Sequence, residues 1–207
     1  MTSTSKSIEQ DVSDKTLLDN IFDYEAKMML SVILNSTKAG LSMFMLSDEK
    51  YLFSLAYIKS VLWECSLLGH LNVFMLSDEF SPTKDQPNRD FHGYAMVFSA
   101  PGFETAYLHH IVVKDKYQKQ GFGGQLMKQI ICTHPSITLV CNKEMIPFYE
   151  KYALTNKGLY NVPDGDNFKL SRGLYNGLHI MSLNGNPTQS LVFMLNDNDL
   201  KKMTFGN

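Results

Sequence analysis

An apolar strand that leads directly into a glycine-rich turn and a helix constrains this sequence more than any other segment. Residues 105–113 (TAYLHHIVV) have the composition of a buried strand, and residues 114–124 (KDKYQKQGFGG) form a polar turn with three glycines. A helical pattern follows over 121–133. Glycines let successive backbone N–H groups turn toward one side, and a helix N-terminus adds about half a positive charge. The segment therefore predicts an anion cradle suited to a pyrophosphate, with a tight turn that binds nothing as the alternative.

The rest of the chain predicts a mixed sheet covered by helices. An amphipathic helix is expected over 14–35 with Ser13 as its N-cap, and Ser47 is expected to cap a second helix that ends at Gly69. Further strands are expected at 42–46, 71–76, 93–99, 137–141, 178–183 and 191–195, and a short helix at 144–152. Helices alternate with strands along the chain, and several antiparallel strands follow one another in its middle. This order indicates an α/β fold whose sheet is mixed, as in α+β proteins.

Composition limits the organisation and the partners. A chain of 207 residues with 44% apolar and 19% charged residues favours one domain, expected over 13–207, after a flexible tail at 1–12. Residues 184–207 are expected to add either a further strand or a dimer contact. The dimer contact would make the protein a homodimer. A net charge of −2 gives no support to a nucleic acid or a membrane as partner, and no apolar stretch reaches membrane length.

Cysteine spacing and the opening residues bear on metals and compartment. Cys65, Cys132 and Cys141 show no metal-binding spacing, so we expect reduced thiols and no metal site. Residues 1–13 are polar and lack the apolar core of a signal peptide. A cytoplasmic location is therefore expected.

The glycine turn resembles a known signature. Gln118-x-x-Gly121-x-Gly123, separated from Val113 by four residues, resembles the Q/R-x-x-G-x-G/A motif of the GNAT superfamily of N-acetyltransferases. Asp115 stands where family members often carry proline. The resemblance implies a GNAT-like acyl-CoA N-acyltransferase fold, a central mixed sheet with helices on both faces, and acetyl-CoA as cofactor. It implies cofactor binding by Ile111, Val112, Val113, Gln118, Lys119, Gln120, Gly121, Phe122, Gly123, Gly124, Asn142, Phe148 and Tyr149.

A second motif lies downstream at the distance that the family shows. Residues 142–154 (NKEMIPFYEKYAL) resemble the family's N-x-x-A-x-x-F-Y-x-K/R-x-G-F segment, with Ala153 and Leu154 in place of Gly-Phe. In the family the cofactor enters where two central parallel strands part. The resemblance implies that these strands are 105–113 and 137–141 here.

One branch of the family is a nearer match. Leu108-His109, and Cys141 followed by IPFYEK at 146–151, resemble arylalkylamine (serotonin) N-acetyltransferases. That branch carries two histidines two residues apart on this strand, where the present chain has Tyr107 and His109. The specific resemblance covers about residues 107–154.

Amine acetylation needs a base and benefits from an acid. An alkylammonium group, with a pKa of about 10.4, must lose a proton before it attacks, and the thiolate leaving group gains from a proton donor. The resemblance implies Tyr149 as the general acid, with a core tyrosine paired to Phe148 as the alternative. Helical periodicity places these two rings on different faces.

His109 is the candidate base, directly or through water, and a satisfied strand histidine is the alternative. Strand alternation places Tyr107, His109, Ile111 and Val113 on one face, so Tyr107 and His109 are candidate acceptor-binding residues. The same alternation places His110 on the opposite face.

The predicted function is transfer of an acetyl group from acetyl-CoA directly to a primary amine. A small arylalkylamine is the first acceptor class, and a polyamine or another small amine is the second. Acetylation of a protein N-terminus or a lysine is one alternative, and a non-catalytic acyl-CoA-binding module is another.

Overall fold

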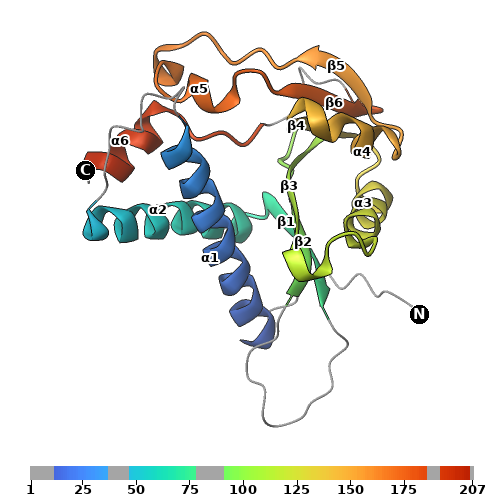
Figure 1. The fold of residues 1–207 in the computed structure, drawn as a ribbon, viewed down its shortest axis with the longest axis horizontal. Helices are drawn as coiled ribbons and strands as arrows, with labels where there is room; N and C mark the ends of the chain where they lie inside the picture. Colours follow the sequence, from blue (N-terminus) through green and yellow to red (C-terminus); the bar gives the residue numbers. More distant parts are fainter. Residues whose placement is uncertain (1–11, 37–46, 78–90, 186–191, 206–207) are drawn as a thin grey trace.

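The structure, a computed structural model, describes residues 12–36, 47–77, 91–185 and 192–205. Its strands are β1 (Leu71–Ser77), β2 (Phe91–Phe98), β3 (Ala106–Val113), β4 (Ile137–Cys141), β5 (Thr155–Leu159) and β6 (His179–Leu183). Its helices are α1 (Val12–Asn35), α2 (Asp48–Leu67), α3 (Phe122–Thr133), α4 (Ile146–Glu150), α5 (Arg172–Tyr175) and α6 (Asp197–Phe205), with 3₁₀ turns at Asp115–Tyr117, Lys143–Met145 and Asp166–Phe168. Figure 1 shows this order along the chain.

The strands form one mixed sheet in the order β1-β2-β3-β4-β6-β5. Neighbours pair antiparallel except β3 and β4, which are parallel. That parallel pairing runs only from Ala106 opposite Ile137 to Leu108 opposite Leu139, although β3 continues to Val113. The two central strands therefore part after Leu108, and β2 and β3 run steeply in Figure 1 while β6 and β5 lie across its top.

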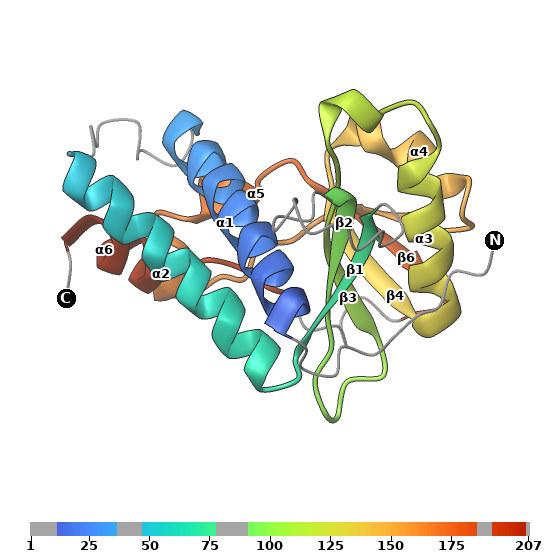
Figure 2. The same ribbon diagram turned by 90° about the horizontal axis from the view of Figure 1, so that it is seen from below.

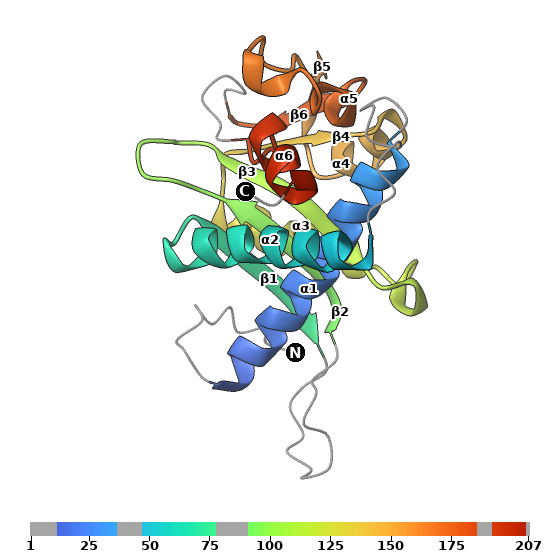
Figure 3. The same ribbon diagram turned by 90° about the vertical axis from the view of Figure 1, so that its left-hand side faces the viewer.

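Helices cover both faces of the sheet, as the sequence predicts. Helices α1 and α2 lie on one face, and α3 and α4 lie on the other (Figure 2). In Figure 3, α1 and α2 cross in front of the strands. One apolar core fills the α1 side, where Phe22, Ile58, Leu62 and Tyr94 are fully buried, and a second fills the α3 side.

A β-bulge interrupts β3 next to the parting strands. Met96 of β2 pairs with His110, but the next residue, Val97, pairs with Leu108. His109 is therefore an extra residue of β3 without a pairing partner in β2. A bulge of this kind places two residues opposite one and resets the alternation of faces. Tyr107 and Val112 consequently pack on the α1 side. The prediction that Ile111 and Val113 share a face with Tyr107 and His109 is wrong, since both pack on the α3 side.

The ends of the helices follow local capping chemistry in part. Ser47 caps α2 and accepts from the Lys50 backbone N–H at 3.4 Å, and Gly69 follows the helix with φ +72°, as expected. Helix α1 begins at Val12, so Ser13 lies inside it and is not its N-cap. The strand expected at 42–46 and residues 1–11 of the expected tail lie outside the described residues.

The C-terminal segment differs from its prediction. Residues 192–195 form no strand, and the chain instead enters α6. Asn196 starts this helix, because its side-chain oxygen accepts the backbone N–H of Asn198 at 2.8 Å and its own N–H reaches Asp199 at 2.8 Å. The helix packs on α2, where the Tyr57 hydroxyl donates to Asp199 at 2.7 Å.

Asp197 joins the first turn of α6 to a distant loop. Its buried carboxylate accepts the backbone N–H groups of Lys169, Leu170 and Ser171 and the Ser171 hydroxyl, at 2.8–3.0 Å. These bonds fix the 169–171 segment, more than 20 residues earlier in the chain, against α6. Of the helices that the structure describes, none combines the length and apolar character needed to cross a membrane.

Candidate active site

The turn between β3 and α3 is closed by the side chain of its signature glutamine. Gln118 Nε2 donates to the Val113 carbonyl at 3.1 Å and to Asp115 Oδ1 at 2.9 Å. The 3₁₀ turn Asp115–Tyr117 lies between Val113 and Gln118 in the sequence. Gln118 thus holds the end of the strand to the start of the loop and fixes the direction in which the chain enters α3.

Two residues in this loop have left-handed backbone. Lys119 has φ +60°, and Gly121, the N-cap of α3, has φ +86°. A Cβ added at Gly121 would have open space around it. The N–H groups of the first turn have no acceptor within the helix, and that turn carries no acidic side chain. Free donors, a helix N-terminus and open space fit a pyrophosphate, which is the anion that acetyl-CoA would place there.

The other two glycines of the turn serve helix packing. A Cβ at Gly124 would collide with the Tyr152 hydroxyl, and a Cβ at Gly123 would lie 3.6 Å from Phe148 Cζ. Helix α3 therefore approaches the α4 segment closely. Asn142, Lys119 and Gln120 are exposed near this region, and Gln120 Nε2 donates to the Lys116 carbonyl at 3.0 Å.

We expect Gly121→Ala to weaken acetyl-CoA binding about tenfold. A residue with a Cβ costs roughly 1–2 kcal/mol in left-handed backbone, and the strain is relieved by distorting the cradle. Gly102→Ala is a matched control, since Gly102 has φ +87° and open space but lies in the turn between β2 and β3. Urea unfolding is expected to show similar destabilisation of both variants, and calorimetric titration a raised Kd in Gly121→Ala alone. Equal affinities in the two variants would refute the cradle.

Tyr149 lies on α4 and is buried in the core of the α3 side. Its ring meets Phe148 edge-on at a centroid distance of 5.1 Å, so the prediction that the two rings lie on different faces is wrong. Burial raises the pKa of Tyr149, and the nearby Cys141 raises it further. Its hydroxyl is therefore protonated at neutral pH, and it has no hydrogen-bond partner among the described residues.

A carboxylate that the sequence analysis missed lies on the opposite face. Glu25, in the middle of α1, is fully buried. Tyr94 donates to Oε2 at 2.5 Å, and His110 Nδ1 lies 3.0 Å from Oε1 and 3.1 Å from Oε2. His109 Nε2 lies 3.4 Å from Oε1. The prediction that His110 points away from His109 is wrong, because the bulge turns both imidazoles toward α1.

Glu25 occupies the apolar stripe of its helix. A carboxylate at such a position is the sequence feature that could have indicated a buried, functional acid. Glu25 follows Leu18, Ile21 and Phe22 at helical spacing and precedes Ala26 and Leu30, all of them buried. Burial would raise the pKa of Glu25, but the charges of His110 and His109 and the hydrogen bond with His110 outweigh it, and the pKa is lowered. The carboxylate is therefore ionised at neutral pH.

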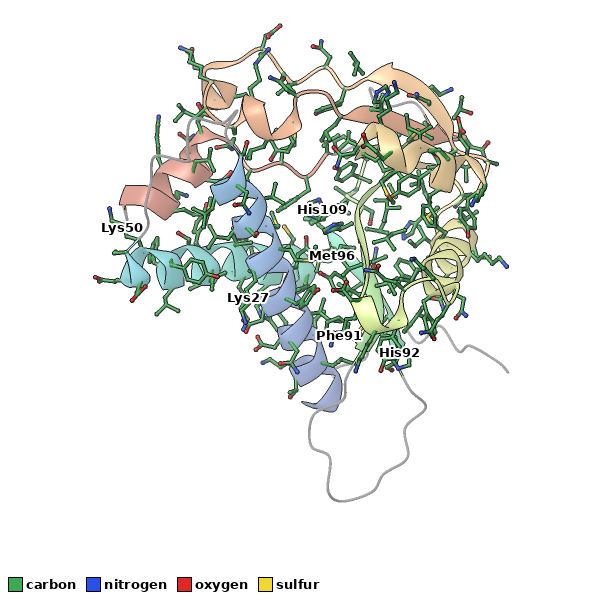
Figure 4. The ribbon with its side chains drawn as sticks, in the orientation of Figure 1. Lys27, Lys50, Phe91, His92, Met96 and His109 are labelled. Carbon is green, nitrogen blue, oxygen red and sulfur yellow. The ribbon has the colours of Figure 1, made fainter. Side chains whose placement is uncertain are left out.

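Aromatic side chains surround His109. Phe193 lies 5.0 Å and Phe98 lies 5.7 Å from its ring centroid, and those two phenyl rings stack on one another at 4.4 Å. Figure 4 shows His109 in the space between β3 and α1. Tyr107 is 2% exposed, so it offers an acceptor almost no surface in this structure. Within the described ranges, no three acidic, cysteine or histidine side chains are placed to hold a metal ion.

A family model agrees with this geometry. Residues 78–152 match the model of the Acetyltransferase (GNAT) domain. The match covers about a third of the chain and identifies a GNAT acetyltransferase domain over those residues. The chain is accordingly an acetyl-CoA-dependent N-acetyltransferase, and the predicted fold class, activity and cofactor are confirmed.

Solved structures to which this chain is similar include several acetyltransferases. An N-acetyltransferase from Staphylococcus aureus is 15% identical, with a TM-score of 0.49 over 80% of this chain and 93% of that one. A Bacillus subtilis acetyltransferase in complex with CoA is 17% identical, with a TM-score of 0.41 over 68% and 93%. A GNAT family acetyltransferase from Elizabethkingia anophelis with acetyl-CoA bound is 17% identical, with a TM-score of 0.36 over 55% and 97%. Comparison with curated protein sequences gives no match.

Proposed function

We propose that this GNAT acetyltransferase acts on a primary amine of a small molecule, with arylalkylamines as the first acceptor class and polyamines as the second. The observation that carries the proposal is the buried carboxylate of Glu25 next to His109, whose ring packs against the stacked rings of Phe98 and Phe193. A carboxylate attracts an ammonium group, and an aromatic wall favours an aryl group attached to it.

The parted strands support a two-sided arrangement. Beyond Leu108, the edge of β3 that faces β4 has no strand partner in the described sheet. Backbone N–H and C=O groups on such an edge can pair with an extended amide chain, such as the pantetheine arm of acetyl-CoA. The cradle at the start of α3 lies on one side of this edge, and the Glu25 cluster lies on the other. We therefore assign the α3 side to the cofactor and the α1 side to the amine.

The residues of the two sides have complementary tasks. When bound, acetyl-CoA supplies the thioester whose acetyl group is transferred. Gln118 and Gly121 shape the loop that would hold the pyrophosphate, and Ile111, Val112 and Val113 would contact the arm through their backbone. Tyr149, kept protonated by burial, would donate a proton to the departing sulfur. On the amine side, the candidate base is a histidine of the bulge, for which sequence reasoning favours His109, directly or through water.

Calorimetry followed by an amine panel tests this function. Acetyl-CoA is titrated first, and thiol release is then measured with tryptamine, spermidine, a peptide with a free N-terminus and a lysine peptide with a blocked N-terminus. We expect micromolar acetyl-CoA binding and the highest kcat/KM with tryptamine. A higher kcat/KM with either peptide would establish protein acetylation instead. Acetyl-CoA binding without thiol release for any amine would indicate a binding module.

A further inference from the structure

The two histidines of the β3 bulge differ in how they contact Glu25. We propose that Glu25 and His110 form a carboxylate–imidazole dyad in which His110 Nε2 removes the proton from the acceptor's ammonium group and Glu25 positions the ring. This inference rests on the proposed amine acetylation. It assigns the base to a residue that regular strand alternation places on the wrong face.

The geometry of His110 defines its two ring nitrogens. Nδ1 lies 3.0 Å and 3.1 Å from the two oxygens of Glu25. A carboxylate only accepts hydrogen bonds, so Nδ1 carries the proton, and the lone pair of the neutral imidazole lies on Nε2. The His110 side chain is 37% exposed, and its Nε2 has no partner among the described residues. A base with one nitrogen anchored and the other open to solvent can receive a proton from an incoming amine.

His109 lacks this arrangement. Its Nε2 points inward and lies 3.4 Å from Glu25 Oε1, where it is buried without a hydrogen-bond partner. Its side chain is 16% exposed, less than half the value for His110. Phe98 and Phe193 lie against its ring. His109 therefore contributes to the wall of the acceptor side and presents less of its ring to an amine.

The charges around His110 favour a basic imidazole. Among the described residues, the titratable groups that face His110 are Glu25 from α1, Tyr94 from β2 through its bond to Glu25, and His109 at a ring distance of 5.9 Å on the same strand. Burial alone lowers the pKa of His110, but the Glu25 charge and hydrogen bond outweigh it and raise the pKa. Tyr94 stabilises the anionic form of Glu25, which in turn stabilises the imidazolium formed by proton transfer.

The bulge also sets the place of His110 in the site. His110 lies two residues beyond Leu108, the last residue of β3 that pairs with β4. It thus flanks the free edge of β3 on the α1 side. In the proposed step, one N–H bond of the ammonium group breaks and one N–H bond forms at His110 Nε2, which later passes the proton to water. The neutral amine that results can attack the thioester carbonyl.

The test compares His110→Gln, Glu25→Gln and His109→Gln in two measurements. The first is the pH dependence of kcat/KM with tryptamine. We expect His110→Gln to lose about 10- to 100-fold in kcat/KM and to lack the acidic limb. Glu25→Gln is expected to retain that limb but move it to lower pH, because the carboxylate that raised the His110 pKa is gone. His109→Gln is expected to keep the limb in place.

The second measurement is an NMR titration of the imidazole protons without substrate. We expect the His110 pKa to fall in Glu25→Gln, and this readout does not depend on turnover. Unchanged His110 titration in a folded Glu25→Gln would overturn the dyad. An acidic limb that survives in His110→Gln or disappears in His109→Gln would also overturn it. Where Glu25→Gln does not fold, His110→Gln and His109→Gln still decide between the two bases.

Calorimetry separates failure of this inference from failure of the proposed function. If every variant and the wild type bind acetyl-CoA but none acetylates any amine, the proposed function fails and the NMR titration still decides whether the dyad exists. If the wild type acetylates tryptamine and His110→Gln does so equally well, the function stands and the dyad is refuted.

Discussion

Tyr149→Phe is expected to lower kcat by about 10²- to 10³-fold while the Kd for acetyl-CoA changes less than about twofold. The change removes only the hydroxyl and keeps the ring packed against Phe148. That hydroxyl has no hydrogen-bond partner among the described residues, so its loss leaves no buried group unsatisfied there. Steady-state kinetics with the best amine, together with calorimetry, measures both quantities.

Tyr51→Phe is the matched control for this loss of a hydroxyl. Tyr51 is exposed at the start of α2, and its removal is expected to leave kcat unchanged. A parallel loss of acetyl-CoA affinity in Tyr149→Phe would instead indicate a packing role. An unchanged kcat would show that another group, or water, protonates the sulfur.

Asp197→Ala is expected to lower the free energy of unfolding by about 3–5 kcal/mol. The substitution leaves three backbone N–H groups and the Ser171 hydroxyl without their acceptor at a buried site. Asp166→Ala is the control in the neighbouring turn, because Asp166 pairs with Lys169 at 2.7 Å but its side chain is 91% exposed. We expect the control to change stability by less than about 1 kcal/mol. Urea unfolding of both variants tests the difference.

The stabilisation by Asp197 also depends on pH. Burial raises its pKa, but the hydrogen bonds from Ser171, Leu170 and Lys169 outweigh this, and the pKa in the folded protein is below the ordinary 3.8. A carboxylate whose pKa is lowered in the folded protein stabilises the fold at pH values above its unfolded-state pKa. This stabilisation is lost as the pH falls through its folded-state pKa. The stability gap between wild type and Asp197→Asn is therefore expected to be constant near neutrality and to narrow below about pH 4. A gap that stays constant down to pH 2 would contradict this assignment.

Local patterns were sufficient for most of the fold. Strands at 71–76, 105–113 and 137–141 combine apolar runs with turn signals on both sides, and the structure places them within one or two residues. The cradle was also predictable, because glycines and a helix start are local features. Helix α6 was missed because its first turn, with Asp197 and Asp199, has the composition of a polar loop. Strand β5 was missed because its residues are almost all exposed and show no alternation.

The amine side could not be predicted, since it depends on contacts between distant segments. The bulge at His109 is defined by how β3 pairs with Met96 and Val97 of β2, and nothing within 105–113 shows an extra residue. Glu25 meets His110 across 85 residues of sequence, through the packing of α1 on the sheet. The nearer resemblance to arylalkylamine N-acetyltransferases stays a prediction until the amine panel is measured.

The bulge changes how this strand must be compared with others. In a strand without the extra residue, alternate positions face opposite sides, so two adjacent histidines cannot both face the same helix. The second histidine against α1 thus depends on the extra residue of the bulge. An ungapped alignment with a regular strand would match every residue from His110 to Val113 to a residue that faces the other way. In such a comparison, side chains correspond when their residues pair with equivalent residues of the neighbouring strand, and not when they have the same number of residues before them.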